Sequence, residues 1–145
     1  MDLVTFVTSV VAGIVSSVLT VVILEIVRRG RDRSAFGTLA GQYAHFSVAG
    51  ERLLDGTTEI AHAGGNILDT RGSSAEGTWR GRIVMSRDLP SSGAGIYQYP
   101  ARTDCGTHHV QLAPDRSSWF VLAVNTSHGK NSATAYVWRR ADRDS

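Results

Sequence analysis

The sequence predicts an all-β fold: a small eight-stranded antiparallel up-and-down β-barrel behind one N-terminal transmembrane helix. Three observations predict it. An uncharged apolar run opens the chain, a cluster of arginines follows directly, and short β-rich runs separated by turn residues fill the rest. We expect a transmembrane anchor at 1–27, a basic juxtamembrane linker at 28–36, a β-barrel domain at 37–141 and a tail at 142–145. About 110 residues outside the anchor are enough for one closed core.

The apolar run extends from Leu3 to Leu24 without a charged residue. As a helix rising 1.5 Å per residue it would reach roughly 33 Å, enough to cross a hydrocarbon core of about 30 Å. A cleaved signal peptide fits poorly, because Asp2 replaces the usual basic start and no small-residue cleavage site precedes the arginines. We therefore expect a permanent single-pass anchor.

Four arginines follow the run, at positions 28, 29, 31 and 33. Arginines are retained on the cytoplasmic side of a membrane, so the C-terminal domain is expected in the cytoplasm. They also suit contact with anionic headgroups. The formal net charge of the whole chain is only +2, which leaves the predicted barrel nearly neutral. This balance argues against binding long nucleic acid.

Eight short runs rich in Val, Ile, Thr, Tyr and Trp follow the arginines. They are 39–48, 57–63, 66–70, 78–85, 95–99, 107–112, 118–126 and 133–140. The connections are too short to hold a crossover helix, so neighbouring strands should pair antiparallel. We interpret the frequent glycines as punctuation between strands. Closure into a barrel removes the exposed edges, and a sandwich is the alternative that the spacing leaves open.

Alternation along a strand assigns side chains to the two faces of the sheet. In the fourth run, Trp79, Ile83 and Met85 share one face and are expected to point inward. Arg80 and Arg82 then lie outside the barrel or at its rim. An eight-stranded barrel is just wide enough to be filled by side chains or to hold one small ligand.

Two short motifs resemble those of lipocalin-type barrels: Gly41-Gln42-Tyr43 at the first strand and the aromatic-basic run 136–140 at the last. The whole architecture also resembles the transmembrane β-barrel effectors of bacterial CBASS anti-phage systems. That resemblance implies a cytoplasmic receptor for a cyclic nucleotide whose assembly disrupts the bacterial inner (plasma) membrane. Members of that family commonly have two membrane helices, whereas this chain has one. No binding residue carries over by motif.

The candidate ligand-binding residues therefore rest on side-chain chemistry. Tyrosine rings can stack on bases, while guanidinium and imidazole groups can pair with phosphates. Ordinary packing in a small barrel is the alternative for each one, as it is for Trp79 and Trp138. The predicted set is Tyr43, Arg80, Arg82, Tyr97, Tyr99 and His109.

No metal, cofactor or catalytic residue is expected. Cys105, His108 and His109 offer zinc-ligand chemistry, but adjacent residues of a strand point to opposite faces and the sequence holds no second ligand pair. Motifs of hydrolases and phosphate-binding loops are missing from the sequence. A single cysteine also leaves no intramolecular disulfide. We expect a binding protein, not an enzyme.

Our leading hypothesis is a membrane-anchored effector that binds a cyclic oligonucleotide and responds by oligomerising in the inner membrane. Small residues at Ser9, Gly13 and Ser17 recur every four positions and would let two such helices approach closely. Two alternatives remain open at this point. One is a membrane-tethered, lipocalin-like carrier of an apolar ligand, and the other is a structural or adaptor barrel without a ligand.

Overall fold

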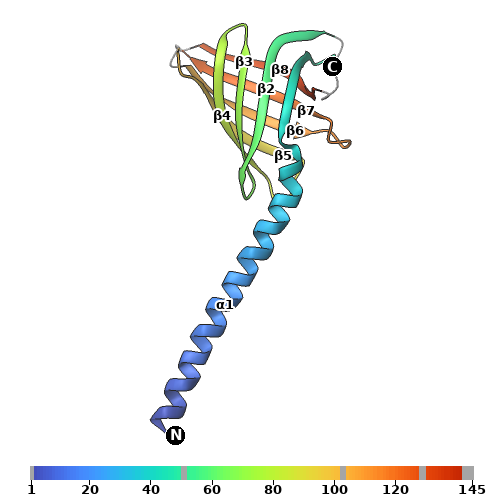
Figure 1. The fold of residues 1–145 in the computed structure, drawn as a ribbon. Coiled ribbons are helices and arrows are strands. Elements are labelled where there is room, and N and C mark those ends of the chain that lie inside the picture. The colour runs from blue at the N-terminus through green and yellow to red at the C-terminus, as the bar shows by residue number, and fades with distance from the viewer. Residues whose placement is uncertain (1, 50–51, 102–103, 128–129, 142–145) are drawn as a thin grey trace.

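The computed structural model describes residues 2–49, 52–101, 104–127 and 130–141, and it shows a long helix that leads into a closed barrel (Figure 1). Helix α1 covers Leu3–Phe36 and continues into a 3₁₀ turn, η1, at Gly37–Leu39. Among the described residues, this helix is long and apolar enough to cross a membrane. The barrel covers none of its apolar stretch. The expected anchor is therefore supported as a possible membrane span.

The described residues form eight strands, and the predicted barrel is confirmed. Each strand pairs antiparallel with its neighbour in sequence, and β1 pairs with β8 to close the ring. The closure rules out the sandwich. The strands are β1 Gly41–Ser47, β2 Leu53–Gly64, β3 Ile67–Ser74, β4 Gly77–Met85, β5 Ser92–Tyr99, β6 Asp104–Leu112, β7 Ser118–Ser127 and β8 Lys130–Arg140.

Several strands run through glycines that the sequence analysis interpreted as breaks, and that interpretation is wrong for the barrel interior. A Cβ atom on Gly56 would lie 2.4 Å from the His45 ring, and one on Gly72 would lie 2.4 Å from the Trp79 ring. These glycines lie within β2 and β3 and leave space for large rings inside the barrel. Their role is steric, so the strands continue past them.

The expected linker at 28–36 is also different in the structure, because α1 continues through it without a break. Arg28 and Arg29 lie 2.8 and 2.9 Å from the Glu25 carboxylate, at the helical spacings of three and four residues. Such pairs favour the helix over an extended linker. The helix therefore connects the apolar run directly to the barrel.

The end of the helix closes one end of the barrel. Phe36 and Leu39 are each 1 % exposed and belong to the same apolar cluster as the barrel interior. The Tyr43 hydroxyl donates to the Leu39 carbonyl oxygen at 2.8 Å, and Arg116 donates to the carbonyl oxygen of Ala35. The last turns of α1 are thus fixed to the barrel by both packing and hydrogen bonds.

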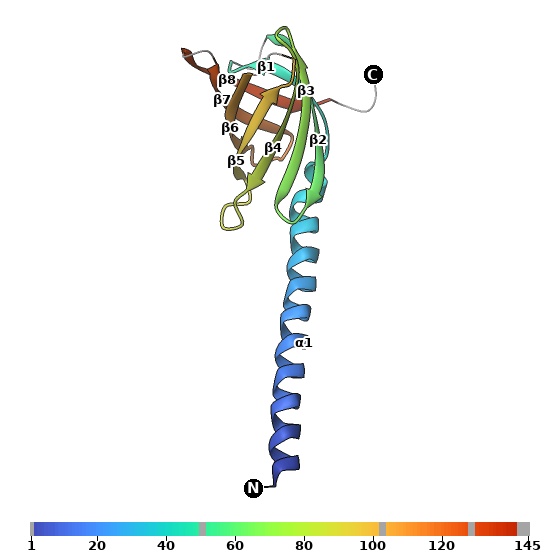
Figure 2. The same ribbon diagram turned by 90° about the vertical axis from the view of Figure 1, so that its left-hand side faces the viewer.

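The barrel interior divides into two halves. The half next to the helix is filled with apolar side chains, among them Ile60, Leu68, Ile83, Met85, Leu112 and Trp119. The far half is at the ends of the strands away from α1 (Figures 1 and 2). Aromatic and polar side chains line an open cavity there. The candidate site described below lies in this far half, whereas packed apolar side chains occupy the near half.

We expect Phe36→Ala to lower the free energy of unfolding by about 3–5 kcal/mol, the range for removing a large side chain from a core. Phe120→Ala is the matched control, since Phe120 lies on the outer wall and is 51 % exposed. Its effect should stay within about 1 kcal/mol. Denaturant unfolding of the full chain in detergent, followed by tryptophan fluorescence, measures both. Equal losses in the two variants would show that Phe36 does not close the barrel.

Candidate ligand-binding site

A cavity of about 330 Å³ lies in the far half of the barrel. This volume is at the lower end of the range of roughly 300–1,000 Å³ for small-molecule sites. Residues of β1–β8 and of the β3–β4 turn line it, so the site depends on closure of the whole barrel. Its lining includes His45, Asp55, Glu76, Trp79, Tyr97, Tyr99, His108, Asn125, Thr134 and Tyr136.

Aromatic rings in mutual contact form the wall of this cavity. The ring of Tyr97 stacks on His108 with centroids 4.3 Å apart, and the edge of Trp79 meets His108 at 5.1 Å. On the other side, His45 stacks on Tyr136 at 5.3 Å. Stacked and edge-to-face pairs are the favourable arrangements of such rings, so each ring holds its neighbours in place. The result is a rigid wall of flat surfaces.

Burial keeps the two histidines of the wall uncharged. His108 is 2 % exposed, and burial lowers its pKa to about 3, with smaller contributions from His45 and His109. Burial likewise lowers the pKa of His45 to about 4. Neutral imidazoles can hydrogen-bond a ligand without carrying a charge.

The hydrogen bonds of these histidines leave one buried atom unsatisfied. His108 Nε2 lies 3.3 Å from the Tyr136 hydroxyl, and His45 Nε2 lies 2.7 Å from the Thr58 hydroxyl. His108 Nδ1 is buried without a hydrogen-bond partner in the described part of the chain. A buried polar atom without a partner is unfavourable, so a bound water or ligand atom would be stabilised there.

The tyrosines of the wall are also neutral. Burial raises the pKa of Tyr97 to about 12, with a smaller contribution from the nearby Tyr99. Burial raises the pKa of Tyr136 as well. The charged residues among the described lining are Asp55 and Glu76, both carboxylates. The cavity therefore presents neutral rings with acceptors near its opening, which suits a flat ligand that carries N–H donors.

The structure distributes the six predicted residues over several places instead of one site. Arg80, Arg82 and Tyr97 line a shared groove of about 780 Å³ along β3–β7. Tyr97 and Tyr99 line the cavity. Tyr43 is buried and bonded to the end of η1, at the opposite end of the barrel. The remaining three, Arg80, Arg82 and His109, lie exposed at outward positions of β4 and β6.

Strand alternation explains the separation. Arg80 pairs with Gln98 and Arg82 with Ile96 on the outside, while Tyr97 between them points inward. Arg82 also forms an ion pair with Asp69 at 2.7 Å on the outer wall. The predicted inward face of Trp79, Ile83 and Met85 is confirmed. A ligand in the cavity cannot reach these arginines through the wall.

Sequence reasoning missed His45, His108 and Tyr136. A usable signal exists for His108, because it shares its strand face with Val110 and Leu112 and is therefore a polar residue on an apolar face. The same alternation places Cys105 and His109 on the outer face, so these two and His108 cannot hold one ion. Among the described residues, no group of three His, Cys, Asp or Glu side chains is arranged for a metal.

Comparison with known proteins gives a fold but no family. No protein family and no curated protein matches this chain. Among solved structures, the chain is similar to a redesigned β-barrel, b11L5F_LGL, with 14 % identity and a TM-score of 0.57 over 74 % of this chain and 96 % of that one. The shared feature is the barrel. The siderocalin Ex-FABP, described as functioning through dual ligand specificities, has 17 % identity and a TM-score of 0.45 over 74 % of this chain and 76 % of that chain.

The buried histidines predict acid sensitivity. Unfolding restores the pKa of both histidines to about 6.5. Below that pH they are protonated in the unfolded chain but remain unprotonated in the folded barrel. Stability is therefore full above about pH 6.5 and falls as the pH drops towards 4. We expect the melting temperature of the full chain in detergent to fall by several degrees between pH 7 and pH 5.

Substitution of single histidines tests whether the buried imidazoles cause the acid sensitivity. His45→Gln should flatten the pH dependence, since it removes one of the two buried imidazoles. His109→Gln, at an exposed position, is the control and should change the profile least, because His109 makes the smallest contribution to the lowered pKa of His108. An unchanged profile in His45→Gln would assign the acid sensitivity to other groups.

Proposed function

We propose that this chain is a membrane-anchored receptor whose barrel binds a cyclic nucleotide in the far cavity and responds by assembling in the membrane. The observation that carries the proposal is the position of the cavity. It is an open aromatic site at the end of the barrel opposite the helix, while the helix end closes the other side. A ligand can thus enter from solvent while the anchor remains in the bilayer.

The wall chemistry supports a nucleobase as the part of the ligand that enters. A flat base can lie against Trp79, Tyr97 and Tyr136, and stacking on such rings contributes about 1–3 kcal/mol per base. Glu76 in the β3–β4 turn can accept hydrogen bonds from the amino and imino groups of a purine. Asp55 alternates with the inward positions Leu54 and Gly56 of β2, so it lies at the outer rim of the opening. Because the described lining holds neither Lys nor Arg, the phosphates would project from the opening into solvent.

The activity proposed is binding, not catalysis. The His45 ring lines the cavity, but the Thr58 hydroxyl beside it is 1 % exposed and is not part of the lining, so this hydroxyl is not placed to attack a ligand. A carrier of long apolar ligands is less favoured, because Phe36, Leu39 and the apolar residues above them fill the near half of the barrel. The remaining space suits a ring system instead of an acyl chain.

The helix supports the second part of the proposal, assembly in the membrane of a bacterial cell with the barrel in the cytoplasm. Nothing within 4 Å would obstruct a side chain at Gly13, which leaves the helix backbone open to a neighbour. The hydroxyls of Ser17 and Thr20 bond to carbonyls one turn back, both at 2.9 Å. Close approach of two such helices would leave these hydroxyls satisfied. Disruption of the membrane in anti-phage defence would follow from this assembly.

Ligand binding is tested by a thermal-shift screen of the full chain in detergent against cyclic dinucleotides, cyclic mononucleotides and a fatty acid. A cyclic nucleotide should raise the melting temperature. Glu76→Gln should weaken its affinity roughly tenfold, as expected for loss of a charge-assisted hydrogen bond. Arg80→Ala, on the outer wall, is the control and should bind normally.

Each other outcome counts against the proposal. Loss of binding in Arg80→Ala would place the ligand on the outer wall. A shift with the fatty acid alone would favour the carrier, and no shift with any compound would favour the adaptor barrel.

Assembly is tested by crosslinking in membranes with and without the ligand found in that screen. Gly13→Ile should reduce crosslinked oligomers several-fold, because the added side chain holds two backbones apart while keeping the segment apolar. Val15→Phe adds bulk on the opposite side of the helix and is the control. Equal crosslinking of wild type and Gly13→Ile would move the contact away from this stripe.

A further inference from the structure

The junction between helix and barrel lies at a defined depth if α1 spans the membrane. The apolar run ends at Leu24, and each polar layer of a bilayer is about 5–8 Å thick. At 1.5 Å per residue, Arg28 and Arg29 lie about 6–8 Å beyond Leu24, and Asp32 lies about 12 Å beyond it. Arg28 and Arg29 are thus at headgroup depth, and the helix end of the barrel lies directly beyond them.

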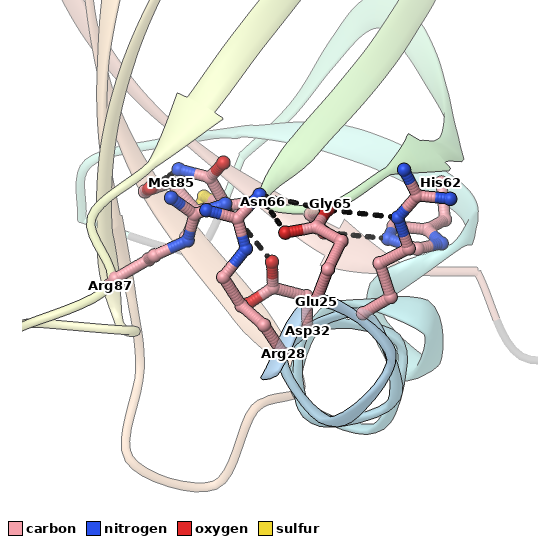
Figure 3. Close-up of polar contacts among 9 residues, drawn as sticks. Glu25, Arg28, Asp32, His62, Gly65, Asn66, Met85 and Arg87 are labelled. Carbon is pink, nitrogen blue, oxygen red and sulfur yellow. Dashed lines mark hydrogen bonds and ion pairs between the residues drawn. The ribbon is translucent and has the colours of Figure 1, made fainter. Parts of the chain in front are cut away.

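A cavity of about 660 Å³ lies at this junction, between α1 and the β2–β3 hairpin. Its lining consists of Glu25, Arg28, Arg29, Asp32, Arg33, His62 and the hairpin backbone at 63–65. Figure 3 shows Glu25, Arg28 and Asp32 of the helix close to His62 and Gly65 of the hairpin. The lining is rich in guanidinium groups, which recognise phosphate through paired N–H donors.

Polar contacts hold the walls of this junction cavity in place. Asp32 is 5 % exposed and its carboxylate lies 3.1 Å from the guanidinium of Arg87, which ties the β4–β5 connection to the helix. His62 Nε2 donates to the Gly65 carbonyl oxygen at 2.9 Å, and the Asn66 amide donates to the Met85 carbonyl oxygen. The hairpin and the helix therefore form a fixed cleft.

The ion pairs of the cleft use only some of the N–H groups of its arginines, so other N–H groups can bind an anion. Glu25 accepts hydrogen bonds from one nitrogen each of Arg28 and Arg29, and a guanidinium has five N–H groups. Arg33 forms no ion pair in the described part of the chain. Including Arg87, the arginines at the junction outnumber the two carboxylates, so the cleft favours an anion.

We propose that this cleft binds the phosphate headgroup of an anionic phospholipid and so seats the barrel against the membrane. Arg28 and Arg29 would hold the phosphate, and Arg33, one turn of the helix beyond Arg29, would add positive charge to the cleft. A lipid is the occupant because the part of the cleft at Arg28 and Arg29 is at headgroup depth, next to where the apolar run ends. The β4–β5 connection lies at the same end of the barrel as α1 (Figure 2), and its Leu89 is 64 % exposed. This inference depends on α1 spanning a membrane and not on the nucleotide site.

The test is native mass spectrometry of the full chain released from nanodiscs of equal phosphatidylcholine and phosphatidylglycerol, with no nucleotide present. Wild type should retain phosphatidylglycerol in preference to phosphatidylcholine. The double variant R28Q/R29Q should lose most of that preference, about tenfold. The double variant R71Q/R80Q removes the same charge from the outer wall and should keep it.

Three outcomes would overturn the proposal. They are no preference in wild type, equal loss in both double variants, or full displacement of the lipid by soluble glycerol phosphate, which would indicate a site for free anions. Equal melting temperatures of the two variants verify that the fold is intact. If R28Q/R29Q unfolds, the single variant R29Q gives the same comparison against R71Q.

Discussion

The structure depends on the insertion of the helix end into one end of the barrel. Phe36 and Leu39 are part of the core, and burial of each contributes roughly 1.5–3 kcal/mol. Arg116 and Arg140 donate to carbonyl oxygens at the end of the helical segment, which would otherwise lack partners. A barrel closed at one end by its own anchor can admit a ligand only at the other. The position of the candidate site follows from this one contact.

The open half is shaped by a match between large rings and glycines. Gly56 leaves room for the His45 ring and Gly72 for that of Trp79, so aromatic side chains fold inward where a larger neighbour would collide. Rings packed in this way exclude water from the histidines, and this exclusion lowers their pKa values. The same packing thus determines both the flat surfaces of the cavity and the uncharged state of its two histidines.

The barrel wall separates two kinds of chemistry. Neutral aromatic groups lie inside, whereas the arginines lie on the outer wall and at the junction with the helix. The separation is physically necessary, since an unpaired guanidinium inside a small barrel would lose its hydration without compensation. The proposed recognition through flat surfaces uses the far cavity. The proposed recognition of phosphate by charge uses the cleft between α1 and the β2–β3 hairpin.

The sequence by itself determined the features that depend on near neighbours in the chain. Apolar length predicted the possible span, and alternation predicted both the strands and the inward face of Trp79, Ile83 and Met85, because each pattern repeats within a few residues. The tertiary structure alone decided the rest. Closure brings His45 of β1 beside Tyr136 of β8, and His108 of β6 beside Trp79 of β4, across distances that no local pattern encodes. The same is true of the helix end: a basic segment that could have been a linker stays helical because Phe36 finds its packing partners inside a barrel formed by residues far along the chain.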